Sequence, residues 1–265
     1  MTDAQSLLHE YDRQLRRRIP RHVPAATTVE RVGPLVRVVG LSCGLIEPPA
    51  VLGVDGDDLD TLIAAQRDFF AERGEAVEWK LREHDLPTSL PRRLVTAGFV
   101  PQPTETVMIG TTAEHVTEVA IPRDVTIRRT TATVDMSRIA DFESDVWQTD
   151  RSRLADDLTA RVSAMGDDYA VFVAETGRRI VAAAWLEIES GTEFAGLWGG
   201  ATAESWRGHG IYRAMVTWRA QLAHRRAIKY LQVDASVDSR PILQRLGFTA
   251  VTTTTPYVWM PNEVD

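Results

Sequence analysis

The chain has 265 residues, of which 44% are hydrophobic and 25% charged, a composition typical of globular proteins with enough apolar material for a core. Its formal net charge of −7 argues against a general nucleic-acid binder, because phosphate backbones require a basic surface. The charge is compatible with a cationic substrate, and the length is typical of two domains or one large one.

The N-terminal residues 1–20 are predicted to form an amphipathic helix and contain no apolar stretch long enough for a signal peptide or a membrane span. We therefore expect a cytoplasmic protein without a membrane partner. Cys43 is the sole cysteine of the sequence, which excludes an intrachain disulfide and argues against a cysteine-based metal site. We expect it to be a small buried residue.

Helix and strand patterns alternate in the rest of the first half. In chain order they predict a helix over 58–74, a strand over 77–81, a short helix over 90–97 and a strand over 104–109. The segment 111–124 that follows lacks apolar periodicity and contains a proline. We interpret it as a linker.

The second half gives clearer signals, in the order strand, helices, three strands, helix, strand, helix, strand. Its strands are predicted over 125–129, 169–175, 180–188, 194–202, 230–234 and 251–259. Its helices are predicted over 136–165, with a break near Thr149, then over 211–222 and 240–246. The expected sheet therefore has strands and helices in close alternation.

The end of the first half repeats in the second half. Both contain a helix, a strand, a short helix ended by Gly-Phe (Gly98-Phe99 and Gly247-Phe248) and a final strand. A repeated order of elements indicates a duplicated unit that composition alone would hide. We therefore predict two domains, over 1–112 and 123–265.

The junction between strand 194–202 and the next helix has the features of an anion-binding loop. From Thr202 to Tyr212 it reads Thr-Ala-Glu-Ser-Trp-Arg-Gly-His-Gly-Ile-Tyr. The first turn of a helix offers unpaired N–H groups and a partial positive charge, and Gly208 and Gly210 allow the backbone to approach an anion closely. Three neighbouring side chains can donate to it: Arg207, His209 and Arg213. The alternative is an ordinary turn in which the glycines only relieve strain.

This loop resembles the phosphate loop of the GNAT acetyltransferases, in which Arg or Gln is followed by two residues, Gly, one residue, and Gly or Ala. Arg207 and Gly210 match that pattern, whereas Tyr212 stands where the last small residue is expected. The resemblance covers about residues 125–260. It implies an α/β (α+β) fold with a mixed central sheet splayed around acetyl-CoA, preceded by a smaller, degenerate GNAT-like domain.

The resemblance also implies where acetyl-CoA would lie. Its pyrophosphate would meet the N–H groups of the glycine loop, its pantetheine arm the end of the preceding strand, and its other side the residues after strand 230–234. The implied cofactor-binding residues are Thr202, Ala203, Arg207, Gly208, His209, Gly210, Ile211, Tyr212, Ser236, Ser239 and Arg240.

The first half has no equivalent loop. The corresponding stretch, residues 53–58, has glycines but carries Asp55, Asp57 and Asp58, whose charges would repel a pyrophosphate at short range. We therefore expect this half to lack cofactor binding and to support the active half or form one wall of the substrate pocket.

The resemblance implies direct attack of an amine on the thioester while both substrates are bound, which requires alignment and a proton acceptor. The inward positions of the strand before the loop, Gly196 and Trp198, cannot act as bases. The nearby carboxylates are Glu187, Glu189, Glu193 and Asp234. Of these, Glu187 and Asp234 are our candidate catalytic residues.

The tyrosine that protonates the leaving thiolate in many members is replaced here by Leu243. Tyr212 and Tyr257 are alternative acids, and backbone donors can also stabilise a thiolate. Four tryptophans of the second half could line an apolar or cation-accepting pocket, although we expect core packing for most of them: Trp147, Trp198, Trp206 and Trp218.

The sequence therefore predicts an acyl-CoA-dependent N-acetyltransferase that acts on an amine of a small molecule, an amino acid or a peptide. The alternative is a non-catalytic acyl-CoA sensor, which the missing base and acid favour. Neither metal-ligand spacing nor a basic stripe is visible in the sequence, so no metal and no nucleic-acid partner are expected. The sequence leaves open whether two chains form a homodimer.

Overall fold

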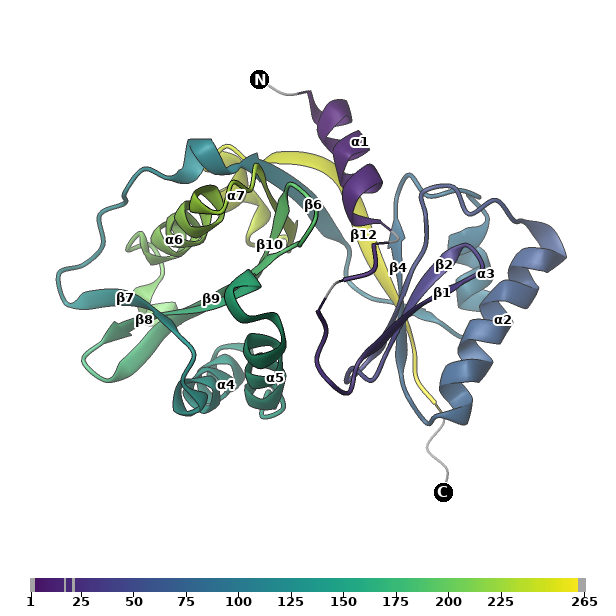
Figure 1. The fold of residues 1–265 in the computed structure, drawn as a ribbon, viewed down its shortest axis with the longest axis horizontal. Coiled ribbons are helices and arrows are strands. Elements are labelled where there is room, and N and C mark those ends of the chain that lie inside the picture. Colours follow the sequence, from purple (N-terminus) through teal and green to yellow (C-terminus); the bar gives the residue numbers. More distant parts are fainter. Residues whose placement is uncertain (1–2, 17, 21, 262–265) are drawn as a thin grey trace.

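The computed structural model describes residues 3–16, 18–20 and 22–261, which form two lobes joined by a 12-stranded sheet (Figure 1). The α-helices of the described chain are α1 (Ala4–Leu15), α2 (Gly56–Glu72), α3 (Leu90–Thr96), α4 (Thr133–Trp147), α5 (Leu154–Met165), α6 (Ile211–Arg225) and α7 (Arg240–Arg245). Short 3-10 helices are η1 (Thr112–His115), η2 (Gly166–Asp168) and η3 (Glu204–Trp206).

The strands belong to one mixed sheet in the order β1-β2-β3-β4-β12-β6-β11-β10-β9-β8-β7, and β5 pairs with β12 beside this path. In chain order they are β1 (Thr28–Val32), β2 (Leu35–Val39), β3 (Gly44–Glu47), β4 (Val77–Arg82), β5 (Val100–Pro101), β6 (Glu105–Thr111), β7 (Val125–Thr130), β8 (Tyr169–Thr176), β9 (Arg179–Ile188), β10 (Phe194–Thr202), β11 (Tyr230–Ala235) and β12 (Thr249–Trp259).

The two halves of the chain exchange their last strands. β6 of the first half pairs with β11 of the second, while β12 of the second half pairs with β4 of the first, and β6 and β12 pair with each other. Outside these antiparallel pairs, β3 lies parallel to β4 and β10 lies parallel to β11. The central part of the sheet is therefore symmetric about the β6–β12 pair, as expected for a duplicated unit.

Helices cover both faces of the sheet because successive strand residues point to opposite sides. On one face, α2 and α3 bury Trp79 and Leu81 of β4, and α6 and α7 bury the other large cluster, which includes Met108 of β6. On the opposite face, α4 and α5 pack on β8 and β9, and α1 packs on β6 through Tyr11. Glu78, Lys80 and Arg82 of β4 also belong to this opposite face.

Helix α1 is fixed to the first half by buried polar contacts. The Arg16 guanidinium donates to both carboxylate oxygens of Asp85, at 2.5 and 2.9 Å. The Tyr11 hydroxyl accepts from the Arg82 guanidinium at 2.7 Å. A bidentate arginine–carboxylate pair holds a fixed geometry, so α1 is held across the middle of the sheet. None of the helices in the described residues is long and apolar enough to cross a membrane.

The predicted helices and strands are confirmed, with differences of a few residues at their ends. β1, β2 and β3 were not predicted. The linker prediction for 111–124 missed η1, where the Thr112 hydroxyl donates to the Ile228 carbonyl at 2.7 Å and His115 contacts the Phe248 ring. Cys43 is half-buried rather than buried, and burial together with nearby Glu78 raises the pKa of its thiol to about 11.

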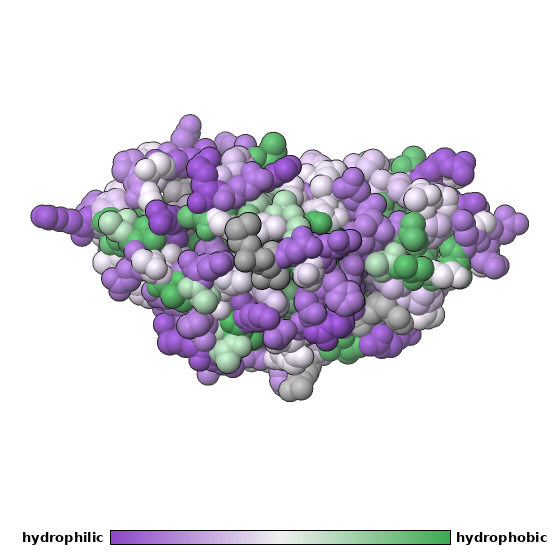
Figure 2. Space-filling view, turned by 90° about the horizontal axis from the view of Figure 1, so that it is seen from above, coloured by the Kyte–Doolittle hydropathy of each residue, from purple (hydrophilic) through white to green (hydrophobic). Residues whose placement is uncertain are grey.

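The surface seen from the α1 side is mostly polar (Figure 2). Apolar side chains appear on this face as small, separate groups between polar ones. Scattered apolar residues are normal for a protein surface, so this face gives no indication of a docking area.

The strand exchange makes the two halves interdependent, which predicts that neither folds alone. Expressed by itself, 123–265 should lack a cooperative thermal transition, because β11 and β12 would lose their common neighbour β6. Co-expressed segments 1–122 and 123–265 should form a 1:1 complex with a cooperative transition. Circular dichroism melts and size-exclusion chromatography measure both; a cooperative transition of 123–265 alone, close to that of the whole chain, would contradict the prediction.

Candidate active site

The sheet opens between β10 and β11. These parallel strands pair only from Phe194↔Tyr230 to Gly196↔Gln232, after which β10 continues along β9 and β11 along β6. A β-bulge between Trp198 and Ala201 bends β10 at the start of the opening. The two strands therefore separate beyond Gly196, and we call the region between their C-terminal ends the β10–β11 gap.

Arg219 of α6 contacts the strands at the bulge, and its side chain is almost fully buried. Its guanidinium donates to the backbone carbonyls of Trp198 at 3.2 Å and Trp185 at 3.3 Å, while its Nε donates to the Met215 carbonyl at 3.0 Å. Burial lowers the pKa of Arg219 to about 10. Arg219 thereby links α6 to β9 and β10 at the residue pair that precedes the bulge.

The glycine loop leads from the end of β10 into α6. Gly208 and Gly210 both have φ of +80°, the left-handed region that glycine adopts without strain. A Cβ at Gly208 would meet no atom within 4 Å, whereas a Cβ at Gly210 would lie 3.1 Å from the Ala120 carbonyl oxygen of the linker. Gly208 therefore faces open space, and Gly210 is the N-cap of α6 beneath the linker.

The side chains of this loop surround the open space. Arg207 and His209 are exposed, with the Arg207 Nε donating to the Thr202 carbonyl at 3.3 Å and the His209 ring contacting the Arg207 carbonyl at 2.9 Å. Arg213 is also exposed, one turn into α6. Ile211 is buried in the core, so only its backbone faces the loop. Cationic groups thus gather at the helix N-terminus.

Two observations at the end of β10 concern the predicted pantetheine contacts. The Thr202 hydroxyl is buried and has no hydrogen-bond partner among the described residues, which leaves a polar atom ready for a ligand. The Ala203 N–H donates to the Val181 carbonyl at 2.9 Å, so it is already used within the sheet.

Tyr212, which departs from the family pattern, is accommodated at the bulge. Its ring lies beside Gly200, where a Cβ would be 3.2 Å from the ring, so the small residue missing at 212 is compensated by one at 200. Burial raises the pKa of Tyr212, which makes its hydroxyl a weaker acid.

The opposite wall of the gap follows β11. The Ser236 and Ser239 hydroxyls contact each other at 3.2 Å, and the Arg240 N–H donates to the Ser236 carbonyl at 2.9 Å at the start of α7. Arg240 is exposed. These residues follow the end of β11 in the chain, on the β11 side of the gap, whereas the glycine loop follows β10.

Glu187 lies on β9 opposite Gly196, the last β10 residue paired with β11. Its carboxylate accepts a hydrogen bond from Arg161 of α5 at 3.3 Å and is 14% exposed. Glu189 pairs with Arg18, and Glu193 accepts from Gln14 at 3.0 Å near α1. The candidate base Glu187 is therefore held in an ion pair.

Asp234 lies on β11, two residues beyond the last pair with β10. Its carboxylate forms a salt bridge with Lys80 of β4 and accepts from Gln232 at 2.6 Å. The Lys80 ammonium also lies 5.8 Å from the ring centroid of Trp198 on β10. Lys80 therefore connects the two sides of the gap on the face that carries α1, α4 and α5.

Sequence reasoning missed the first-half residues beside Asp234. Lys80 and Glu78 come from β4, and Glu105 comes from β6. Burial, together with the negative charges of Asp234 and Glu78, raises the pKa of Glu105 to about 7, although Lys80 acts in the opposite direction. Charges alternate with apolar residues in β4, whereas Glu105 is the one charged residue of β6. Their distance from the loop in sequence hides the connection.

The expectation that most of the four tryptophans pack in the core was wrong. Trp147, Trp198 and Trp218 are 52%, 37% and 40% exposed. Trp198 projects over Gly196, where a Cβ would lie 2.5 Å from its indole nitrogen. An exposed indole at the opening of the gap can therefore contact a ligand.

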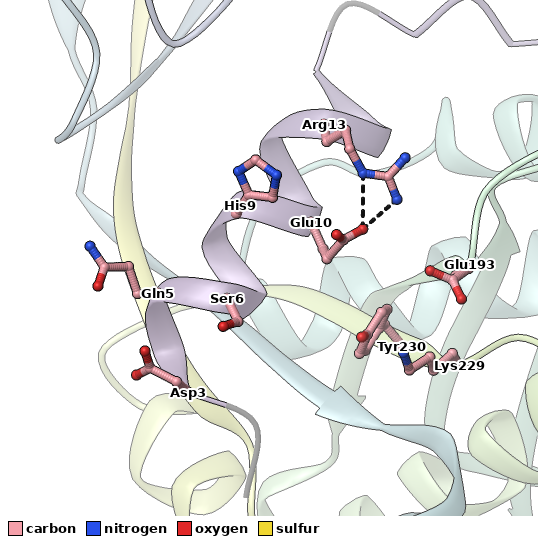
Figure 3. A pocket seen from close by; sticks show the side chains of 9 residues that line it. All are labelled: Asp3, Gln5, Ser6, His9, Glu10, Arg13, Glu193, Lys229 and Tyr230. Atoms are coloured by element: carbon pink, nitrogen blue, oxygen red, sulfur yellow. Dashed lines mark hydrogen bonds and ion pairs between the residues drawn. The ribbon is translucent and has the colours of Figure 1, made fainter.

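A separate hollow of about 550 Å³ lies beside α1 (Figure 3). It is lined by polar residues such as Glu10, Arg13 and Lys229, and the Arg13 guanidinium is directed at Glu10. Glu193, Lys229 and Tyr230 place it at the N-terminal ends of β10 and β11, away from the gap at their C-terminal ends. No group of three or more potential metal ligands occurs in the described part of the chain.

Comparisons with known proteins agree with this geometry. Residues 135–248, from α4 to the end of the Gly-Phe stop, match the model of the acetyltransferase (GNAT) family. A GCN5-related N-acetyltransferase from Kribbella flavida superimposes with a TM-score of 0.65 at 17% identity, covering 96% of this chain and 93% of its own. No curated protein sequence matches the chain.

Two further solved structures have similar folds. A tandem GNAT protein from the clavulanic acid biosynthesis pathway gives a TM-score of 0.60 at 14% identity, covering 92% of this chain and 86% of its own. A GCN5-related N-acetyltransferase from Sphaerobacter thermophilus gives 0.64 at 16% identity, covering 89% and 84%. Residues 135–248 therefore correspond to a GNAT acetyltransferase domain, and the chain has the fold of GNAT proteins. Membership of this family is consistent with acetyl transfer from acetyl-CoA in general.

The Lys80–Asp234 salt bridge predicts a charge-dependent loss of stability. Lys80→Met should lower the free energy of unfolding by about 3–5 kcal/mol at pH 7, because it leaves a buried carboxylate without its cation. Lys80→Arg is the matched control and should retain most of the stability. Urea unfolding at pH 7 measures this, and equal losses in the two variants would assign the effect to packing instead.

Proposed function

We propose that the chain transfers the acetyl group of acetyl-CoA to an amine of a small molecule, an amino acid or a peptide, by direct attack while both substrates are bound. The observation that carries the proposal is the β10–β11 gap, which ends at a left-handed glycine loop on the N-terminus of α6. The match of 135–248 to the GNAT family supports it.

The loop suits the pyrophosphate of acetyl-CoA. Backbone N–H groups from Gly208 to Tyr212 belong to the loop and first turn of α6, where an anion accepts several hydrogen bonds and meets the positive end of the helix dipole. The exposed Arg207 and Arg213 side chains add charge-assisted donors. The open space at Gly208 leaves room for a phosphate group.

The rest of the predicted set would hold the remainder of the molecule. The unpartnered Thr202 hydroxyl suits an amide of the pantetheine arm. Both backbone groups of Ala203 are already hydrogen-bonded, its N–H to Val181 and its carbonyl to Trp206. Across the gap, Ser236, Ser239 and Arg240 offer polar groups toward the nucleotide end. Bound acetyl-CoA would supply the activated acetyl thioester.

The protein must then align an amine with the thioester and accept its proton. Glu187 and Asp234 stay candidates, and each is engaged with a cation, Arg161 and Lys80 respectively. Trp198 and Lys80 form an apolar and a polar wall at the opening of the gap. Leu243 is fully buried, so it offers no acid, and a leaving thiolate would depend on backbone donors or on the transferred proton.

The first half, 1–112, would act as a structural and pocket-forming copy without a cofactor site of its own. At the start of α2 the Asp55 carboxylate accepts from the Gly56 N–H at 2.8 Å. An internal carboxylate therefore occupies the position that an anion would take at the helix N-terminus.

The loop assignment predicts a charge effect that can be separated from a steric one. Gly208→Asp and Gly208→Asn add side chains of equal size at a left-handed position that both residues tolerate. The aspartate should weaken coenzyme A binding more than the asparagine by about 10-fold to 100-fold, from roughly 1–3 kcal/mol of repulsion at separations of about 6–10 Å. Gly208 is preferable to Gly210, where an added side chain would also meet the linker.

Calorimetry should also give one acetyl-CoA site per chain, and thermal melts should show that both variants fold. Equal affinities of the two variants would mean that the loop does not contact phosphate. Steady release of free coenzyme A with a primary amine supports the enzyme, whereas tight binding without turnover would favour the alternative, a non-catalytic acyl-CoA sensor.

A further inference from the structure

The strand exchange brings first-half carboxylates to the opening of the β10–β11 gap. Val107 of β6 pairs with Asp234 of β11, and Glu105 lies two residues before Val107, so both carboxylates belong to the same face of the sheet. On β10, Trp198 lies two residues beyond the last pair with β11. Lys80, which contacts both Asp234 and Trp198, spans the opening.

The charges on this face do not balance within the described residues. Lys80 pairs with Asp234, and Arg82 pairs with Glu47. Glu78 and Glu105 are half-buried and make no salt bridge with any described residue. Two carboxyl groups beside the opening of the gap are therefore left without an ion-pair partner of their own among the described residues, which favours a positively charged ligand.

Glu105 has the protonation behaviour of a base that works at neutral pH. Burial raises its pKa to about 7, with further contributions from Asp234 and Glu78 against the effect of Lys80. These charged groups come from β11 and β4; between Glu105 and β4, β12 contributes the uncharged Thr254. A carboxyl group that titrates near 7 can take a proton and release it again.

We propose that Glu105, supplied by the first half, is the proton acceptor for the transfer and that the acceptor substrate is a cationic primary amine. This proposal rests on the proposed function and names the base and the substrate class of that same site. Glu187 is the rival, but its carboxylate is paired with Arg161, so it would have to give up an ion pair to take a proton.

The proton and electron pairs balance as follows in the proposed step. Glu105 takes one proton from the ammonium group, which frees an electron pair on nitrogen. The nitrogen forms a bond to the thioester carbonyl carbon, the carbon–sulfur bond breaks, and its electron pair stays on sulfur. The second proton lost by nitrogen goes to the thiolate. The products are the acetamide, free coenzyme A and protonated Glu105, which returns its proton to water.

The first test needs no turnover. In the full chain labelled with ¹³C at glutamate carboxyl carbons, one signal should titrate near pH 7 and disappear in Glu105→Gln. The melting temperature of Glu105→Gln should exceed that of the parent more at pH 8 than at pH 5, because a carboxylate with a raised pKa destabilises the fold only when it is ionised. A Glu105 signal that titrates between pH 4 and 5 would overturn the proposal.

The second test uses acetyl-CoA with spermidine, lysine amide and a peptide with a free N-terminus as probes. Glu105→Gln should lower kcat/KM by about 100-fold or more at pH 7, the usual contribution of a general base, while acetyl-CoA affinity stays unchanged. The parent's kcat/KM should rise with pH up to about 7, and this limb should be absent in the variant. Glu105→Asp, which keeps a carboxyl group, should recover part of the rate.

Two further variants separate a proton acceptor from a structural residue. Glu78→Gln should shift the acid limb to lower pH, because it removes one of the charges that raise the pKa of Glu105. In Glu187→Gln, the rise of kcat/KM with pH up to about 7 should remain. If Glu187→Gln abolishes the limb while Glu105→Gln keeps it, the base is Glu187 and the proposal fails. If the parent protein binds no acetyl-CoA, the proposed function fails, whatever the pKa of Glu105.

Discussion

The exchange of β6 and β12 between the two halves is the constraint on which the rest of the structure depends. β6 pairs only with second-half strands, β11 and β12, and β12 pairs only with first-half strands, β4, β5 and β6, so neither half can complete its sheet alone. The exchange also fixes β4 at a set distance from β11, which allows Lys80 to reach Asp234. A backbone arrangement thereby determines which side chains meet at the gap.

The gap itself exists because β10 cannot follow β11 beyond Gly196. Gly199 and Gly200 take left-handed conformations in the bulge, and Arg219 donates to the Trp198 and Trp185 carbonyls beside it. A buried arginine without a carboxylate partner is costly, which its lowered pKa reflects. That cost falls at the place where the two strands separate, which under the proposed function is the place where the cofactor would bind.

The sequence contained enough information for the elements and the loop but not for the walls of the site. Period-two and period-3.6 patterns are local, so strand 194–202 and the helix after Gly210 could be located, and the glycine loop followed from chemistry within eleven residues. Glu105 and Asp234 are far apart in the chain, and the order of the strands brings them to the same part of the sheet. Hydrophobic patterns do not encode strand order. β1, β2 and β3 are short and closely spaced, so their patterns were too weak to separate.

The proposed roles of the two halves give a reason to retain the first one. Asp55 caps α2 with its own carboxylate, which would compete with a phosphate at that helix N-terminus. Its β4 and β6 meanwhile carry Lys80, Glu78 and Glu105 on the face that also holds Asp234 and Trp198. Loss of these strands would remove three of these four charged groups. Under the proposed function, cofactor binding would depend on the second half, whereas both halves would contribute to the environment of the acceptor.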